Sequence, residues 1–436
     1  MKENTELKKT LGLSSLILFG LAYMTPMIIF GTYGVIYEAS GGQVAPSYIM
    51  AMVAMLFTAI AYAVMAKKIP KSGSSYGYVS HVFGEKLGFL VGWVILLDYL
   101  FLPMVIWLIG GVYLEAYAPS VPSWFWLVAF IVLTTGLNII GFDVAKKVNL
   151  VLMGLQLAVI IAFCALAMMM VSEPSESLVS APATPLNINL MFIGAAIACY
   201  SFLGFDAVST MAEETKDPKK NVPKAIIWVT VLGGTIFAGA SYIMGTAFPD
   251  ISVFNTDSAA ADMATQVGGI VFSSIFVATL VIAQFTSGVS AQAGASRLIY
   301  AMGRDGVLPN SAFGRLHDKF KTPYASIILV GIVGLLALKL DITTSTSFIN
   351  FGAFLAFIFV NLCAIVSYLR MPQQERTALS LFTHIIAPTL GIACISKLLI
   401  SLDIHAITLG LCWLAIGIVL MVFLVNRGTK LKLEIE

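Results

Sequence analysis

Apolar residues follow one another along this chain in long blocks, and polar residues are largely confined to the short stretches between the blocks. A block of about 18 to 25 mostly apolar residues is long enough to cross a bilayer as an α-helix. We therefore predict twelve transmembrane helices, at residues 13–37, 45–66, 87–116, 123–141, 147–171, 188–211, 223–247, 267–296, 324–340, 345–369, 381–400 and 405–426.

The composition indicates the same class of protein. Of the 436 residues, 59% are hydrophobic and only 11% are charged, and a soluble globular domain cannot bury that much apolar surface. We expect an all-α polytopic membrane protein of the cell membrane, surrounded by the lipid bilayer. A formal net charge of +2 gives no reason to expect nucleic acid as a partner.

The residue types that carry enzyme chemistry are not arranged for it. All five cysteines lie inside apolar runs and lack Cys-x-x-Cys spacing, so neither a disulfide framework nor a zinc site is expected. The four histidines lie in or beside the predicted connections. With no nucleophile, base and metal-ligand set in the spans, we expect no enzyme activity, no metal and no cofactor.

Lysine and arginine residues are concentrated on one side of the predicted membrane. Cytoplasmic loops carry the excess of these residues, so their placement tests the number of spans. With the N-terminus inside, 23 of the 25 basic residues fall on the cytoplasmic side, and only Lys339 and Lys397 fall outside. We therefore expect the terminal segments 1–12 and 427–436 to be cytoplasmic.

Two of the predicted helices are interrupted. In the first, Pro26 removes a helix donor and disfavours helical geometry at Thr25. The sixth is interrupted at 201–204 and then carries Asp206, an acid at membrane depth, where acids normally face a cavity or a protein interior. Matched interruptions of this kind are typical of inverted-repeat transporters with a solute site at the midplane. The alternative is an ordinary proline kink and a packing glycine.

The predicted helices divide into two five-helix repeats, 13–171 and 188–369, followed by two further helices within 381–426. The basic connection 67–86 is predicted to form a short amphipathic or re-entrant element, and 296–323 is predicted to be its counterpart in the second half. Pro223 is expected in the first turn of the seventh helix, where proline is well tolerated.

Three stretches carry a family resemblance: SFLGFDAVSTMAEETKDPKKNVPKAI, IPKSGSSYGYVSHVFGEKLGFLVGW and GASRLIYAMGRDGVLP. Together they resemble the amino acid, polyamine and organocation superfamily of permeases. The stretches GLAYMTPM, LLDYLFLPM, FPDIS and FINFGAFLAFIFVNL are similar to the bacterial putrescine importers of that superfamily. The resemblance implies a LeuT-like fold, with a five-plus-five inverted repeat and two peripheral helices. It also implies alternating access driven by an ion gradient.

The chain departs from the family pattern at three places. Met24, Thr25 and Pro26 stand where many members have a Gly-Ser-Gly break. Gly31 stands at a position that looks acidic in the putrescine importers, which makes Gly31 a candidate selectivity position. Gln156 stands where some proton-coupled members place a lysine, and Gln156 cannot carry that charge.

An amino acid presents a carboxylate and an ammonium group, and broken helices offer a partner for each. Helix N-termini attract anions and unwound carbonyls attract cations. We expect the N–H groups of Met27 and Ile28 to bind the carboxylate, and the carbonyls of Tyr23, Tyr200 and Leu203 to bind the ammonium. The family resemblance also implies an aromatic gate at Tyr200, although Tyr200 and Phe202 are equally compatible with simple helix packing. The candidate solute-binding residues are Tyr23, Met24, Thr25, Pro26, Met27, Ile28, Asp98, Tyr200, Ser201, Phe202, Leu203 and Gly204.

The candidates for proton coupling or gating are Asp206, Asp98 and Gln156. Protonation of a buried carboxyl such as Asp206 can respond to the state of a cavity, or Asp206 can be a structural acceptor for backbone donors freed by the break. Asp98 is predicted either to neutralise an amine of the solute or to be satisfied by neighbouring polar groups.

Thr286, Ser287 and Ser290 in the eighth helix are candidates for a sodium site facing the first helix, although small polar residues also allow close helix packing.

Taken together, these features lead us to expect an importer of an amino acid or putrescine that is coupled to protons, with sodium as the alternative. A channel or a nutrient sensor of the same fold is the second hypothesis, but neither a pore filter nor a soluble signalling domain is visible.

Overall fold

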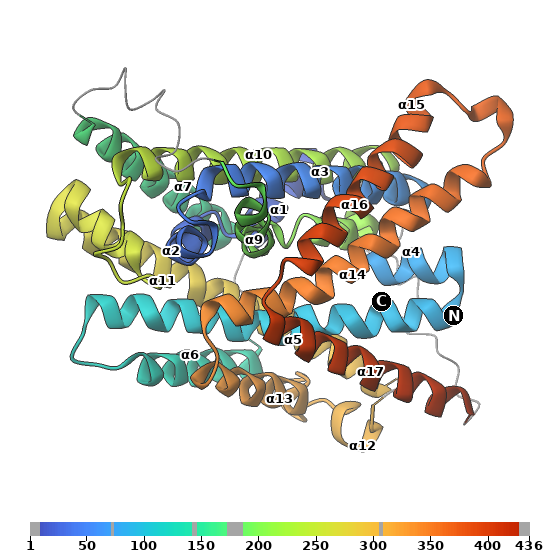
Figure 1. Cartoon of the computed structure of the whole chain (residues 1–436). Coiled ribbons are helices and arrows are strands. Elements are labelled where there is room, and N and C mark those ends of the chain that lie inside the picture. The colour runs from blue at the N-terminus through green and yellow to red at the C-terminus, as the bar shows by residue number, and fades with distance from the viewer. Residues whose placement is uncertain (1–8, 71–73, 142–145, 172–185, 305–307, 427–436) are drawn as a thin grey trace.

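The computed structural model describes residues 9–70, 74–141, 146–171, 186–304 and 308–426. The regular structure of these residues is helical, apart from one isolated β-bridge between Leu11 and Thr215. Figure 1 shows long helices packed side by side as one bundle, with the short α4 on the right and the connection between α5 and α6 on the left. The long apolar segments therefore form the helical membrane bundle that their composition predicts.

The elements follow the predicted order. They are α1 Leu13–Met24, α2 Ile28–Ser40, α3 Val44–Lys68, α4 Ser74–Phe83, α5 Glu85–Tyr117, α6 Ser123–Ile140, α7 Lys146–Met170, α9 Ile188–Ala198, η1 Cys199–Phe202, η2 Asp206–Glu214, α10 Pro218–Ala247, α11 Ala259–Arg304, α12 Asn310–Phe313, α13 Tyr324–Gly334, η3 Leu335–Leu338, α14 Ile342–Leu369, η4 Gln373–Glu375, α15 Ala378–Leu381, the π-helical turn η5 Phe382–Ile386, α16 Ala387–Ile400 and α17 Ile404–Asn426.

About ten membrane spans are identified by length and composition alone within the described residues. The pair α1 and α2, bent by 48°, adds an eleventh span if the pair is counted as one. The shorter apolar helix Tyr324–Leu338 lies where the ninth span is expected. The class of an all-helical polytopic membrane protein is thus established, and each predicted span has a helical counterpart.

Some predicted boundaries are wrong. The seventh helix begins at Pro218, so Pro223 lies inside α10 rather than in its first turn. Pro218 occupies the first helical position, where its missing N–H leaves no hydrogen bond unmade. The eighth helix is longer than predicted because α11 continues across a kink at Gly269, which has a φ of +67°.

The two predicted short elements differ in size. The first is the ten-residue helix α4, which lies against α5 and α14. In the expected counterpart, 296–323, α11 extends to Arg304, the single turn α12 follows at Asn310–Phe313, and residues 314–323 are not helical. A carbonyl of α4, that of Val82, accepts a hydrogen bond from Arg370 at the end of α14.

The bundle has a basic end and an acidic end. We call the end where α3 stops and α5 begins the basic end, because Lys68 and Lys86 lie there. At the opposite end, the acidic end, Asp257 lies near Glu38 and Asp341. Asp341 caps α14 by accepting a hydrogen bond from the Thr344 N–H at 2.6 Å.

A backbone link joins the start of α1 to the end of η2. The N–H groups of Thr10 and Leu11 donate to the Glu214 carbonyl at 2.9 and 3.0 Å. The Lys216 N–H donates to the Leu11 carbonyl at 2.9 Å. Two segments that are about 200 residues apart in the sequence are therefore held together beside the basic end.

Candidate functional site

The two interrupted helices touch at their breaks. Gly204 has a φ of +116°, a backbone conformation that L side chains rarely adopt. A Cβ atom at this position would also overlap the ring of Tyr23, the last but one residue of α1. Only glycine meets both the backbone and the contact requirement, so the break in the sixth span is built against the break in the first.

Residues 25–27 form the first break. Pro26 prevents a continuous helix, and Thr25 adopts the left-handed conformation with a φ of +51°. The Ile28 N–H donates to the Thr25 carbonyl at 2.8 Å, and the Met27 N–H donates to Oε1 of Gln156 at 3.4 Å. The two N–H groups that we expected to bind a solute carboxylate therefore already have protein partners. The hydrogen bond of the Ile28 N–H is the shorter of the two.

The second break lies slightly later than its predicted limits. The α-helix ends at Ala198, a 3₁₀ turn follows, and residues 203–205 are not helical. The Leu203 N–H donates to the Tyr200 carbonyl at 3.2 Å. Asn350 of α14 donates from Nδ2 to the Ala196 carbonyl at 2.7 Å, one turn before the break. This support from Asn350 has no sequence signal, because it depends on which helix packs alongside.

A chain of hydroxyl groups connects the breaks to α3. The phenol of Tyr48 lies 3.0 Å from Oγ1 of Thr32 in α2 and 3.1 Å from Oγ of Ser201 in η1. All three side chains are buried. Ser201, a predicted solute residue, is therefore directed toward this structural network.

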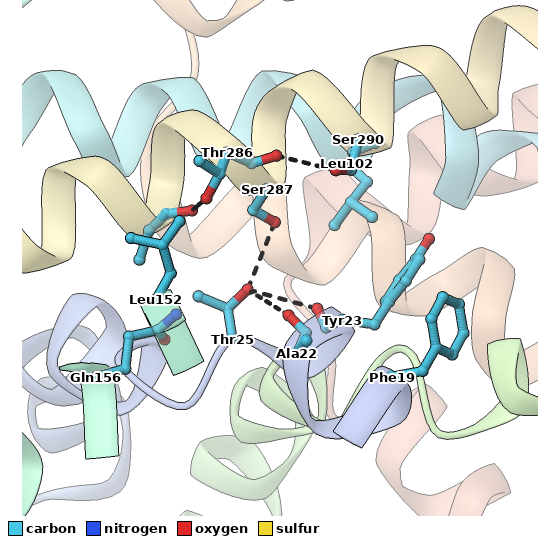
Figure 2. A pocket seen from close by; sticks show the side chains of 12 residues that line it. Phe19, Ala22, Tyr23, Thr25, Leu102, Leu152, Gln156, Thr286, Ser287 and Ser290 are labelled. Carbon is cyan, nitrogen blue, oxygen red and sulfur yellow. Dashed lines mark hydrogen bonds between the residues drawn. The ribbon is translucent and has the colours of Figure 1, made fainter. Parts of the chain in front are cut away.

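Figure 2 shows a cavity beside the first break, with Thr25 facing Ser287 of α11 and Gln156 of α7 alongside. The cavity has a volume of about 100 Å³. Its other lining residues lie on α1, α5, α7 and α11: Phe19, Ala22, Tyr23, Leu102, Leu152, Ala283, Thr286, Ser290 and Ala291.

Oxygen atoms gather on one side of this cavity. The Thr25 hydroxyl lies 3.4 to 3.5 Å from the carbonyls of Ala22 and Tyr23 and from Oγ of Ser287 (Figure 2). The hydroxyls of Thr286 and Ser290 donate to carbonyls of their own helix, but each retains lone pairs that can accept. These uncharged oxygens are of the type that a hard cation such as sodium prefers.

A narrow second cavity of about 20 Å³ shares Tyr23, Thr25, Leu102 and Ser287 with the first. Met24 and Ile28 line it from the first span, Tyr200 and Leu203 from the sixth, and Ile106 and Gln284 complete it. Gln284 was not among the predicted site residues. The signal was its spacing of three residues from Ser287, which places both on one face of α11. Gly31 lies beside this group, since a Cβ there would be 3.9 Å from Nε2 of Gln284 and 2.9 Å from Cγ2 of Ile109.

The two intramembrane acids have different surroundings. Asp206 is 8% exposed, and its carboxylate accepts hydrogen bonds from the backbone N–H groups of Gly204 and Ala207. Asp98 lies one helical turn before Leu102, and its Oδ1 has no hydrogen-bond partner among the described residues. Both acids lie close enough to the Tyr23 phenol to interact with it electrostatically.

The aromatic residues of the sixth span also differ in environment. Tyr200 lines the narrow cavity. Phe202 is fully buried and packs edge-on against Phe237 of α10, with ring centroids 5.4 Å apart. Phe202 therefore has the contacts of a packing residue, whereas Tyr200 borders the space that a solute would occupy.

On the acidic side of the breaks the bundle is closely packed. The Phe30 ring lies 4.8 Å from the rings of both Phe163 and Phe276. Gly34 is in direct contact with the backbone of Thr256, because a Cβ at position 34 would overlap the Thr256 carbonyl. The cavity around Thr25 lies on the basic side of this packed region, because Phe19, Ala22 and Tyr23, which line it, precede the first break.

A multi-pass helical bundle, with two broken spans meeting beside an internal cavity, defines a membrane transport protein. A sequence model of the family described as "Amino acid permease" matches residues 11–431. The chain belongs to this family, within the amino acid, polyamine and organocation superfamily. It is a multi-pass permease of the plasma membrane and not an enzyme.

Curated relatives cover nearly the whole chain. The low-affinity putrescine importer PlaP of Escherichia coli is 38% identical over 95% of this chain and 93% of its own length. The branched-chain amino acid permease BcaP of Bacillus subtilis is 28% identical over 98% of this chain and 95% of its own length. The methylthioribose transporter of Bacillus subtilis is 27% identical over 98% of this chain and 96% of its own length.

Proposed function

We propose that this permease is a secondary active transporter that imports a small amine-bearing solute, an amino acid or putrescine, by alternating access. The observation that carries this proposal is the contact between the broken first and sixth spans at Tyr23 and Gly204, beside a cavity that Tyr23 lines together with Tyr200 and Leu203 of the sixth span. Breaks at membrane depth leave backbone groups available for solute and ion only where they line a cavity.

An inverted repeat of five plus five helices, with two peripheral helices, is supported by the way that helices pair. The second span, α3, packs along the seventh, α10, and the third, α5, packs along the eighth, α11. The start of the first span contacts the seventh, and the start of the sixth contacts the second. When the two halves are interchanged, the first two pairings stay the same and the last two are converted into each other, as a repeat requires.

We assign the basic end to the cytoplasm, with both termini there, because lysine and arginine mark cytoplasmic loops. The cavity around Thr25 then lies between the breaks and the cytoplasm, while the Phe30 cluster packs closely on the outer side of the first break. This arrangement corresponds to an inward-facing conformation.

Among the coupling ions we favour the proton, with Asp206 as the coupling residue. Asp206 directly follows the second break, and its carboxylate binds the backbone there, so its protonation would alter the break directly. The oxygens of Thr25, Ser287 and Ala22 support sodium as the second candidate. Gln156 contacts the first break without a charge and is proposed to hold that break in position.

The test is uptake of labelled amino acids and polyamines into proteoliposomes, under separate proton and sodium gradients. We expect accumulation that follows the proton gradient, and we expect Asp206→Asn to abolish its dependence on that gradient. Accumulation that follows sodium and ignores pH would transfer coupling to the oxygens around Thr25. Equilibration without accumulation under either gradient would favour a channel or a sensor.

A further inference from the structure

Gln284 carries a buried amide whose Nε2 group has no partner in the part of the chain that the structure describes. Its side chain is 1% exposed. A buried donor without a partner is unfavourable because it has lost its hydrogen bonds to water, so most buried polar groups have partners. Gln292, two turns further along α11, shows the usual case, because it donates to the Thr135 hydroxyl at 2.8 Å and to the Ile327 carbonyl at 3.2 Å.

The position of Gln284 is that of a ligand-binding group. It lines the narrow cavity together with residues of both breaks, Met24, Tyr200 and Leu203. That cavity holds only about 20 Å³, enough for one small polar atom or group. The larger cavity adjoins it through Tyr23, Thr25, Leu102 and Ser287, so a solute in the larger space could place one end against the amide.

The opposite requirement is met by Asp98. Its unpaired Oδ1 is an acceptor, while the carboxylate of Asp206 already binds backbone donors. Among the described residues, the narrow cavity therefore has one amide donor without a partner, and one helical turn before Leu102, which lines both cavities, Asp98 has one carboxylate oxygen without a partner. An α-amino acid supplies both partners, because its ammonium group donates and its carboxylate accepts.

We propose that Gln284 is a specificity-determining residue, which binds the carboxylate of an α-amino acid and thereby favours amino acids over diamines. This inference rests on the proposed transport function. A diamine in its charged form carries only N–H donors and cannot satisfy the Nε2 group. The nearby donors of the first break do not replace Gln284 in this role, since Ile28 and Met27 already bind Thr25 and Gln156.

The experiment measures transport kinetics of purified variants in proteoliposomes, normalised to reconstituted protein. The probes are L-leucine, isopentylamine, which lacks the carboxylate of leucine, and putrescine. Gln284→Met keeps the length of the side chain and removes the amide. We expect KM for leucine to rise about 10- to 100-fold. The constants with which isopentylamine and putrescine inhibit leucine uptake should change by less than about threefold.

A second variant reverses the preference. Gln284→Glu places a carboxylate in the narrow cavity, which repels the carboxylate of leucine and attracts an ammonium group. We expect leucine uptake to fall and inhibition by putrescine to strengthen. Gln266→Met is the matched control, because Gln266 lies on the same helix but is exposed, and its kinetics should equal those of the unaltered protein.

Two results would overturn the inference and leave the transport function standing. One is unaltered protein that accumulates putrescine but no amino acid. The other is a Gln284→Met variant whose constants for leucine and putrescine change by the same factor, which is the behaviour of a structural amide bound to a buried water. If the unaltered protein accumulates no solute of either class, the proposed function itself fails.

Discussion

The carboxyl groups of Asp98 and Asp206 lie close enough to interact electrostatically but have different partners. Asp206 binds the backbone of the second break, whereas one oxygen of Asp98 is unpaired. The sequence indicates both acids, because a carboxyl at membrane depth is costly and therefore conspicuous. It does not distinguish them, because their hydrogen-bond partners are set by the path of the backbone around Gly204.

Gln284 and Asn350 were missed for a related reason. Amides are less conspicuous than acids in an apolar helix, and their roles depend on which neighbouring helix each side chain faces. Pro26 and Gly204 were found because their covalent structure limits the backbone whatever surrounds them. The candidate site was thus predictable where backbone geometry defines it and not where side chains from other helices complete it.

A testable pH effect concerns Asp257, in the connection between α10 and α11. Burial raises the pKa of this carboxyl, and the nearby carboxylates of Asp341 and Glu38 raise it further. A raised pKa in the folded state means that the contribution to stability is fully present below the unfolded pKa and is lost as the pH rises through the folded pKa. At pH 8 the ionised side chain is therefore unfavourable.

We expect Asp257→Asn to raise Tm at pH 8, by an amount on the order of 1 °C because the group is half exposed, and to have little effect at pH 4. Thermal unfolding in detergent at both pH values measures this. Asp250→Asn is the control, since its pKa is lowered by the Ser252 N–H and its loss should not raise Tm at pH 8. An equal rise of Tm for Asp257→Asn at pH 4 would contradict the electrostatic explanation.

At the scale of elements, each break divides one span into two half-helices. The bend of 48° between α1 and α2 directs Tyr23 toward the sixth span, and Gly204 allows that span to approach. The ends of most helices were predicted well, because apolar blocks and polar connections determine them. The kink within α11 and the short 3₁₀ and π segments were not, since they redistribute hydrogen bonds inside an apolar block without changing its composition.

Gly204→Ala tests the contact between the two breaks. The new Cβ must overlap the Tyr23 ring in a backbone conformation that is unfavourable for alanine, so we expect a loss of about 1–3 kcal/mol in stability and strongly reduced uptake. Gly239→Ala in α10 is the control, because a Cβ there meets nothing within 4 Å and alanine favours helices. Tm and uptake that are the same for both variants would show that the contact is not needed.

At the scale of the whole molecule, the all-helical, multi-pass class followed from the apolar blocks of the chain, but the conformation did not. In the alternating-access cycle that we propose, the inward-facing and outward-facing conformations would have the same apolar blocks and the same basic loops. The packed Phe30 cluster and the cavity around Thr25 depend on how the helices lie against one another, which leaves no pattern in the sequence.

The side on which the cavity opens can be measured by cysteine labelling. Ser290 is exposed and lines the cavity around Thr25. In a variant whose five native cysteines are replaced by alanine, Ser290→Cys should react with a charged, membrane-impermeant thiol reagent from the cytoplasmic side, and solute should slow the reaction. Ser252→Cys, which is exposed in the connection at the acidic end, should react only from outside. Faster labelling of Ser290→Cys from outside would contradict the inward-facing assignment.

The backbone link between Leu11 and Thr215 has a mechanical consequence. The three hydrogen bonds are together worth about 1.5–4.5 kcal/mol, so a motion that separated α1 from η2 would be slowed roughly tenfold to a thousandfold relative to one that carried them together. Under the proposed alternating-access mechanism we therefore expect α1 and η2 to move together. Because main-chain atoms form this link, the side chains at these positions can change during evolution while the link persists.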